Sequence, residues 1–516
     1  MGDDLDELLA RVALTEDAAR PEAVDRRHAS GGRTARENIE DLIDAGSLVE
    51  YGRFAVAAQR QRREVQELVE QTPADGIIGG TATINGELFG ERGACAVVSY
   101  DYTVIAGTQG ATGHLKKDRL FELIERMRLP TVFYAEGGGG RPGDTDYPVV
   151  SALQVRAFAL WAGLSGVVPR IAVVHGRCFA GNAVIAGCSD LIVATEGSNL
   201  GMGGPAMVAG GGLGEVTPEE IGPAAVQSAN GVIDVLVADE AEATALARRL
   251  VGYFQGRAPS WTQPDQESLR AAVPERQRRA FDPLPVVETL CDEGSVTVLR
   301  EAFAPEMLTA LGRIEGRPVG IIANDSRHVA GAITSDAADK AARLLQLCES
   351  FGLPVVSLVD TPGMMVGPEH EETGLVRHTS RLLVSAAALT VPFVAVVLRR
   401  GYGLGAQAMM AGSTHEPLLT VAWPGAHMGP MGLEGAVRLA LRRELEEIAD
   451  DAEREERVRE VTAAAEENAR VLNAAGLFEI DDVIDPAQTR RLIASTLDAA
   501  CRAPREPSGR RFVDTW

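Results

Sequence analysis

The sequence predicts an α/β protein built from two similar halves, and three observations support this. Apolar strand-like segments alternate with helical segments on both sides of a proline-rich stretch, as in mainly parallel sheets covered by helices. The segment 169–183 aligns with 392–406 without a gap. A glycine-containing turn precedes each copy, at 136–140 and at 360–363. The repeat therefore predicts two domains of the same fold.

The length and charge of the chain limit its organisation and its partners. At 516 residues it exceeds a single core, and we expect domains at 1–256 and 291–516 joined by a polar, proline-rich linker at 257–290. A net charge of −23 argues against nucleic acid as a partner. No run of about 18 uncharged apolar residues is present, so no membrane span is expected. The acidic N-terminus is not that of a signal peptide, which favours a cytoplasmic enzyme.

Local patterns predict the elements of the first half. Residues 1–70 are expected to be helical, and strands at 76–84 and 94–101 flank Asn85 and Gly86, a pair typical of hairpin turns. A helix at 117–128 and a buried strand at 131–135 follow.

The second half is predicted in the same way. Strands at 310–314 and 318–324 flank a turn, and a helix at 336–351 leads into a strand at 354–359. A highly charged helical tract is expected over 434–474.

The glycine turns are the candidate catalytic features. Glycine allows close approach and positive φ, so that neighbouring N–H groups can converge on one oxygen and form an oxyanion hole. Such a site stabilises the enolate formed when a thioester loses an α-proton. The candidate donors belong to one turn pair in each half: Gly137, Gly138, Gly139, Gly181 and Asn182 in the first, and Gly363, Met364, Leu404 and Gly405 in the second.

No side chain is an obvious general base or metal ligand. His175 is more readily explained as a strand-end histidine, and Asp360 serves equally well as a turn-former. The spacing of His370 and His378 matches no common zinc set, so no metal is expected. Neither a phosphate-binding P-loop nor a convincing dinucleotide motif is present. Strong N–H donors without a base suit a reaction whose base comes from a cofactor.

Several motifs in order carry a family resemblance. The chain resembles the carboxyltransferase (beta) subunits of biotin-dependent acyl-CoA carboxylases, such as propionyl-, acetyl- and methylcrotonyl-CoA carboxylases, over roughly residues 28–500. The motifs that carry it are 28–50, 75–86, 100–107, 317–324, 339–343, 359–363 and 399–403.

The resemblance implies two crotonase-like (ββα superhelix) domains, with the acyl-CoA on the N-terminal side and biotin on the C-terminal side. It implies an active site between subunits of a homo-hexamer. A carboxyl group would pass from carboxybiotin to the α (or vinylogous) carbon of an acyl-CoA through an enolate. The first turn pair would hold the thioester oxygen and the second the biotin ureido oxygen, beside the cofactor-binding residues Gly403, Ala406 and Gln407.

Differences from the family pattern leave alternatives open. The first turn runs from Glu136 to Arg141, longer than the common Ser-Gly-Gly-Ala-Arg, so any of Gly137, Gly138 or Gly139 can be the donor. Gln407, with Ala406 in place of a tyrosine, suggests an acyl group longer or more polar than acetyl. The chain could instead be a biotin-dependent acyl-CoA decarboxylase subunit, or a catalytically reduced CoA-binding homologue.

The sequence also sets expectations about partners and variants. It has no biotin-attachment motif and no ATP-grasp domain, so a biotin carboxylase or biotin carboxyl carrier partner is expected to bring the biotin. We expect a Gly405→Val variant to lose carboxyl transfer while its fold stays nearly intact.

Overall fold

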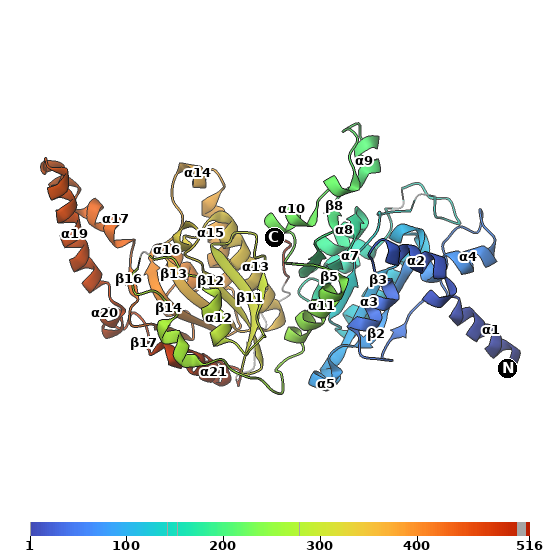
Figure 1. Ribbon diagram of the computed structural model, residues 1–516, viewed down its shortest axis with the longest axis horizontal. Coiled ribbons are helices and arrows are strands. Elements are labelled where there is room, and N and C mark those ends of the chain that lie inside the picture. Colours follow the sequence, from blue (N-terminus) through green and yellow to red (C-terminus); the bar gives the residue numbers. More distant parts are fainter. Residues whose placement is uncertain (1, 142, 152, 278, 503–511) are drawn as a thin grey trace. The chain divides into compact units, whose positions relative to one another are not determined.

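The computed structural model describes residues 2–141, 143–151, 153–277, 279–502 and 512–516. The chain divides into two compact units (Figure 1). The first comprises Met1–Gly256 with Arg511–Thr515, and the second Arg257–Arg510 with Trp516. Each unit is an α/β domain with one main sheet, which confirms the predicted class.

The first unit is built on a seven-stranded sheet in the order β1-β2-β3-β4-β5-β7-β9. Its first three strands pair antiparallel and the rest pair parallel. The strands are β1 (Val49–Glu50), β2 (Ile77–Thr83), β3 (Ala94–Tyr100), β4 (Thr131–Tyr134), β5 (Arg170–Val174), β7 (Leu191–Thr195) and β9 (Val235–Val237). A separate parallel pair joins β6 (Arg177–Phe179) to β8 (Asn199–Gly201).

Helices on this sheet bury an aromatic core. The rings of Phe121, Phe133 and Trp161 pack together, with the centroids of Phe121 and Trp161 4.9 Å apart. The helices are α1 (Gly2–Ala13), α2 (Pro21–Ala29), α3 (Ala35–Leu42), α4 (Val65–Gln71), α5 (Gly86–Phe89), α6 (Ala111–Met127), α7 (Ala157–Gly163), α8 (Gly181–Gly187), α9 (Pro205–Gly210), α10 (Ala224–Ala229) and α11 (Glu240–Phe254). The predicted hairpin is confirmed, because β2 and β3 pair antiparallel, but its connection is longer than a tight turn and contains α5 and a 3-10 turn at Gly90–Gly93.

The second unit has an eight-stranded sheet in which β10-β11-β12-β13-β14-β15-β17 form the main path and β16 pairs with β14. The strands are β10 (Thr297–Leu299), β11 (Met307–Ile314), β12 (Arg317–Asn324), β13 (Val355–Thr361), β14 (Phe393–Tyr402), β15 (Leu419–Ala422), β16 (His427–Gly429) and β17 (Asp482–Val483). Its helices are α12 (Leu284–Leu290), α13 (Ser335–Phe351), α14 (Pro368–Glu371), α15 (Leu375–Ala387), α16 (Gly403–Met409), α17 (Leu433–Ala440), α18 (Arg442–Glu447), α19 (Asp451–Asn468), α20 (Val471–Gly476) and α21 (Thr489–Ala500).

Two predicted segments have more structure than the sequence suggests. The charged tract at 434–474 divides into α17, α18, α19 and α20, shown in orange to red in Figure 1. The segment 257–290, expected to be a linker, contains α12 and buries Leu269, Val286 and Leu290 in the core of the second unit.

The internal repeat is visible in both backbone and side chains. β5 lies between β4 and β7 and leads by way of β6 into α8, while β14 lies between β13 and β15 and leads into α16. The aligned segments 169–183 and 392–406 therefore occupy equivalent places, as predicted. α6 and α13 are both 17 residues long, and each buries a lysine at its sixth position, Lys116 and Lys340. Both lysines donate to backbone carbonyls.

Candidate functional site

The first glycine turn follows β4 and is held by its own backbone. The N–H of Gly137 donates to the carbonyl of Arg177 (2.7 Å), and the N–H of Gly139 donates to Oδ1 of Asn182 (3.1 Å). Both glycines have positive φ, +130° and +89°, which a side chain would strain. Two of the predicted donors, Gly137 and Gly139, therefore already have partners inside the chain.

Two other N–H groups are available to a ligand in the first unit. Those of Gly140, in the turn, and Gly181, at the start of α8, have no hydrogen-bond partner among the described residues. Both glycines line one cavity of about 590 Å³. The N–H of Gly138 also has no partner in the part of the chain that the structure describes, but Gly138 does not line this cavity. Gly140 belongs to the glycine turn that the sequence predicts as an oxyanion hole, although it was not among the named donors, and its counterpart in the repeat is Met364, which was.

The walls of this cavity are largely apolar. Leu115, Tyr147, Val149, Val155 and Phe158 contribute to it. His114 on α6 also lines it, and burial together with the nearby charge of Lys117 lowers the pKa of His114 to about 3, so that its ring is neutral. Asp118, one turn further along, has its pKa raised by burial. The cavity can thus take an apolar chain whose polar end meets the two N–H groups.

Asn182 is a structural residue at this site. Its side chain is fully buried and uses all of its hydrogen-bonding capacity. Nδ2 donates to the carbonyls of Gly107 (3.1 Å) and Glu136 (2.8 Å), while Oδ1 accepts from Gly139 and from Nε2 of Gln109 (2.9 Å). Asn182 therefore ties the start of α8 to the glycine turn.

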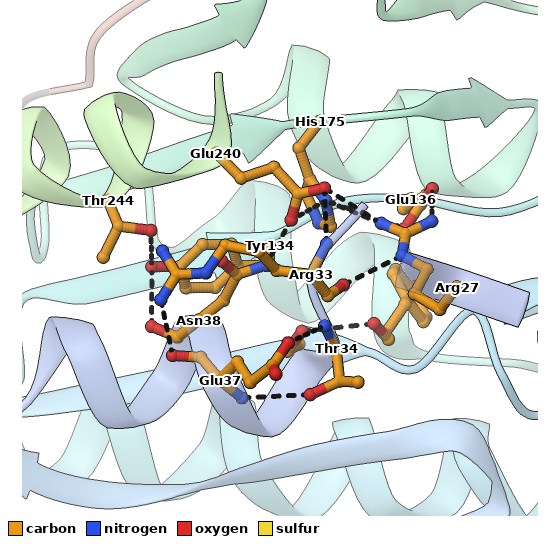
Figure 2. A network of polar contacts seen from close by, with 12 residues as sticks. Arg27, Arg33, Thr34, Glu37, Asn38, Tyr134, Glu136, His175, Glu240 and Thr244 are labelled. Atoms are coloured by element: carbon orange, nitrogen blue, oxygen red, sulfur yellow. Dashed lines mark hydrogen bonds and ion pairs between the residues drawn. The ribbon is translucent and has the colours of Figure 1, made fainter. Parts of the chain in front are cut away.

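Behind the turn lies a buried polar network, shown in Figure 2, that engages Glu136 and His175. Arg27 pairs with Glu136 (2.8 Å) and with Glu240 (3.2 Å), and Nδ1 of His175 lies 3.2 Å from Glu240. Burial would raise the pKa of Glu240, but His175, Asn38 and the charge of Arg27 together lower it to about 2. Glu136 and His175 are thus engaged away from the cavity, which neither residue lines.

The second glycine turn follows β13 and repeats the first. Ile333 donates its N–H to the carbonyl of Gly363 (3.1 Å) and accepts from the N–H of Met365 (2.9 Å). In the first turn, Gln109 bonds in the same way to Gly139 (2.8 Å) and Arg141 (2.9 Å). The N–H of Gly363 is used by Oγ1 of Thr361 (3.1 Å), so this predicted donor has a partner too.

The second turn and the start of α16 together supply the remaining N–H groups. Those of Met364, Leu404 and Gly405 have no hydrogen-bond partner in the described part of the chain. A Cβ atom at Gly405 would lie 2.5 Å from the carbonyl carbon of Gly363, so Gly405→Val cannot leave the fold intact, contrary to expectation.

Other predicted residues near this turn differ in exposure. Gly403 has φ +59°, the left-handed region that the turn requires. The side chain of Ala406 is buried in the second unit, whereas Gln407 is exposed. Asp360 is buried between Arg399 (2.7 Å) and Arg400 (2.8 Å), so its carboxylate is not free to act as a base.

Clusters of metal-ligating side chains are absent from the part of the chain that the structure describes. These residues contain no group of three or more His, Cys, Asp or Glu side chains that could hold a metal ion. His378 instead contacts Asp339 (2.6 Å). None of their helices is both long and apolar enough to cross a bilayer.

Comparison with known proteins places this geometry in a family. The chain matches the Carboxyl transferase domain family over residues 26–512. It is 32% identical to the methylmalonyl-CoA carboxyltransferase 12S subunit of Propionibacterium freudenreichii subsp. shermanii, covering 92% of this chain and 90% of that one. It is also 32% identical to the propionyl-CoA carboxylase beta chain of Saccharopolyspora erythraea, over 92% of this chain and 89% of that chain.

Solved structures show the same relationship. A single-chain, multi-domain long-chain acyl-CoA carboxylase is 52% identical, with a TM-score of 0.91 over 96% of this chain. This chain spans 48% of that protein. The transcarboxylase 12S crystal structure is 30% identical, with a TM-score of 0.85 over 99% of this chain and 98% of that chain.

The chain therefore belongs to the carboxyl transferase family, and both of its units have the crotonase-like fold. Within that family it is of the carboxyltransferase-subunit class of biotin-dependent acyl-CoA carboxylases.

Proposed function

We propose that this chain transfers a carboxyl group from biotin, carried on a partner, to the α-carbon of a long-chain acyl-CoA. The observation that carries this proposal is the largely apolar cavity of about 590 Å³, with the N–H groups of Gly140 and Gly181 in its wall. A shorter acyl group would leave much of that cavity unfilled. The relative that shares 52% identity is described as a long-chain acyl-CoA carboxylase, which supports the same substrate class.

In this proposal, the first turn stabilises the charge that develops during the reaction. The N–H groups of Gly140 and Gly181 donate to the thioester oxygen, which becomes negative as the α-proton leaves. Preorganised donors of this kind lower a barrier by roughly 3–4 kcal/mol each. The substrate oxygen is held while the apolar walls exclude water from the acyl chain.

The second turn is assigned to biotin. Its N–H groups at Met364 and Leu404 suit a neutral ureido oxygen, which is a hydrogen-bond acceptor. Biotin supplies the carboxyl group and a ring nitrogen that can accept the α-proton. The carboxylates at the two turns, Glu136 and Asp360, are both paired with arginine, so neither is free to take up the α-proton.

Partners and assembly follow from the relatives. We infer that a biotin carboxylase or biotin carboxyl carrier partner delivers the biotin, and that the chain works as a homo-hexamer in the cytoplasm. Hexamer assembly is described for the transcarboxylase 12S protein, which matches 99% of this chain. A net charge of −23 repels a polyanion along its whole length. A small anionic substrate can still bind, because only the groups of its own site need to attract it.

A chain-length series tests the proposal. Acetyl-, hexanoyl-, decanoyl- and palmitoyl-CoA are each offered with a carboxylated biotin partner, and kcat/KM for transfer is measured. Burying one methylene contributes about 0.8 kcal/mol, so kcat/KM should rise roughly fourfold per CH₂ until the cavity is full. A preference for acetyl-CoA would contradict the long-chain assignment. No transfer to any acyl-CoA would contradict the proposed function itself.

The cavity wall offers a matched pair of variants for the same series. Phe158→Ala changes the wall, and Phe512→Ala removes an exposed phenylalanine of the same unit that does not line the cavity. We expect Phe158→Ala to change the chain-length profile and Phe512→Ala to leave it as in the wild type. Identical profiles in both variants would place the acyl chain elsewhere.

A further inference from the structure

Lys117 is a buried cation in the first unit that the mechanism above does not use. It lies at the seventh position of α6 with its side chain inaccessible to solvent. Its Nζ donates to Oε1 of Gln109 and to the hydroxyl of Tyr100 (3.1 Å). It also lies 5.4 Å from the ring centroid of Tyr100 and 6.0 Å from that of Phe158.

This lysine has no carboxylate as a direct partner. Among the described residues, no acidic oxygen lies within ion-pair distance of Nζ. A buried charge without a counter-ion is costly to maintain, and structural lysines usually avoid that state. Lys117 is therefore a buried cation that the charges of Asp118 and Asp75 offset only in part, and a further negative charge near it would favour its charged form.

Hydrogen bonds connect Lys117 to the first glycine turn. Nζ donates to Oε1 of Gln109, and Nε2 of Gln109 donates to Oδ1 of Asn182 (2.9 Å). The same Oδ1 accepts from the N–H of Gly139, next to Gly140. A Cβ atom at Gly181 would lie 2.6 Å from Nε2 of Gln109, so Gly181 must be glycine for this amide to fit.

The lysine and the backbone agree on the orientation of the two amides. An ammonium group can only donate, so the oxygen of Gln109 faces Lys117 and its nitrogen faces Asn182. The N–H of Gly139 and the carbonyls of Gly107 and Glu136 orient Asn182 so that its oxygen accepts from Gln109. The cation thus sets the direction of the Gln109 amide, which meets an Asn182 that the backbone has already oriented.

The described residues of the second unit show no such connection. The seventh residue of α13 is Ala341, Ile333 makes the backbone contacts of Gln109, and Gly405 stands in the place of Asn182. There the turn is held by direct packing of Gly405 against Gly363. The polar connection therefore exists only in the unit assigned to the thioester, where a negative charge develops.

We propose that Lys117, acting through Gln109 and Asn182, is a positioning residue that stabilises the enolate at the first glycine turn. The inference rests on the proposed function, because it requires a thioester oxygen beside Gly140 and Gly181. Lys117 does not touch the substrate. It holds the Gln109 amide in the orientation that donates to Asn182, and its positive charge favours the anionic form of the substrate.

The protonation state of Lys117 gives the proposal a pH signature. Burial lowers the pKa of Lys117 to about 7, while the charges of Asp118 and Asp75 act in the opposite direction. The other ionisable groups around it are His114, which is neutral, and Tyr100, whose pKa is raised by burial. Loss of the lysine proton should slow transfer as the pH rises above about 7.

Lys116, the neighbouring residue, provides a matched control. It is also buried on α6, and it donates to the carbonyls of Gly52, Ala74 and Ile77, none of which lines the cavity. We expect Lys117→Met to lower the single-turnover transfer rate at least tenfold with little change in KM, and to flatten its pH profile between 7 and 9. Lys116→Met should stay within twofold of wild type.

Binding of a charged analogue tests the same idea without biotin. A CoA derivative ending in a nitronate carries the charge of the enolate, and the matching CoA thioether is uncharged. We expect the wild type and Lys116→Met to bind the nitronate more tightly than the thioether, and Lys117→Met to lose at least tenfold of that preference. Should Lys117→Met fail to fold, Gln109→Leu, which breaks the connection but keeps the cation, is measured against the same criteria.

The possible outcomes separate the two proposals. A nitronate preference that is unchanged in Lys117→Met, or transfer rates that fall equally in both lysine variants, would overturn the role of Lys117. Wild-type protein that binds neither analogue would contradict the proposed function, and with it this inference.

Discussion

Glu136 and Asp360 hold the same position in the two halves of the chain. Each is a buried carboxylate close to the end of a central strand and just before a glycine turn, and each is paired with arginine. Arg27 lies 2.8 Å from Glu136, while Arg399 and Arg400 lie 2.7 and 2.8 Å from Asp360. The repeated carboxylate fixes the turn, and the N–H groups that follow it are left to bind a ligand.

Asp360→Asn tests this role in the second unit. The change keeps the shape but leaves Arg399, which is fully buried, without its carboxylate. Breaking a buried pair in this way costs about 3–5 kcal/mol, so the Tm of the second unit should fall by several degrees. Glu434→Gln, which disrupts an exposed pair with Arg438, is the control and should have little effect. Equal Tm values for the two variants would show that the Asp360 pairs do not support the fold.

Asn182→Leu removes the connection between α8 and the first turn. Leucine has a similar volume, but it leaves the N–H of Gly139 and the carbonyls of Gly107 and Glu136 without partners. Each buried unpaired group costs about 1–3 kcal/mol, so both the Tm and transfer should fall sharply. Asn230→Leu, at an exposed position in the same unit, is the comparison. Full activity in the Asn182 variant would mean that the turn keeps its shape without this side chain.

Gly405→Ala should disturb the second turn even though the side chain is small. Its Cβ would lie 2.5 Å from the carbonyl carbon of Gly363, a distance that requires the backbone to move. We expect a lower Tm and loss of carboxyl transfer, whereas Leu404→Ala, one residue earlier and exposed, should keep the wild-type Tm. Thermal unfolding followed by circular dichroism distinguishes them, and a Gly405→Ala variant as stable as wild type would refute the close packing.

The buried lysines predict how stability depends on pH. Burial lowers the pKa of Lys340 to about 7 and that of Lys116 to about 8, from an ordinary value of 10.5. Between pH 7 and 10.5 the unfolded chain therefore binds more protons than the folded chain, and raising the pH favours folding by up to about 1.4 kcal/mol per pH unit for each lysine. Above pH 9 the buried thiols oppose this, because burial raises the pKa of Cys95 to about 12.

Lys340→Met isolates one of these contributions. The wild-type Tm should rise between pH 7 and 9, and the variant should show a smaller rise over the same interval. Lys340 lies in the second unit, on α13, so the effect is independent of the cavity in the first unit. Parallel pH profiles for the two proteins would mean that Lys340 keeps its proton throughout.

The repeat could be predicted from the sequence because its turns depend on glycine, whose presence shows where the backbone takes an unusual conformation. Glycines at 363 and 403, and the gapless segments around them, mark turns that need positive φ, and these positions are found where expected. The pairing of the N–H groups could not be predicted in the same way. Gly137 and Gly139 are candidate donors in the sequence. In the fold, their N–H groups donate to Arg177 and Asn182, which come from distant elements.

Lys117 shows a second limit of sequence reasoning. On a helix rich in charged residues it cannot be told from Lys116 by pattern. In the described part of the chain, both side chains are buried and neither has a carboxylate in ion-pair contact. Only the fold shows that one faces backbone carbonyls and the other faces Gln109. The hairpin expected around Asn85 does form, but its connection could not be predicted, because Asn85 takes φ +58° to begin α5 rather than a tight turn.

A single-turnover measurement tests the central claim most directly. A biotin partner carrying a ¹⁴C-labelled carboxyl group is mixed with the wild-type chain and palmitoyl-CoA, and the label in the acyl-CoA fraction is followed with time. We predict that the label moves to the α-carbon of palmitoyl-CoA in the wild type, and at least tenfold more slowly in Asn182→Leu. Label that stays on the biotin partner, with palmitoyl-CoA bound and the wild-type chain folded, would contradict the account.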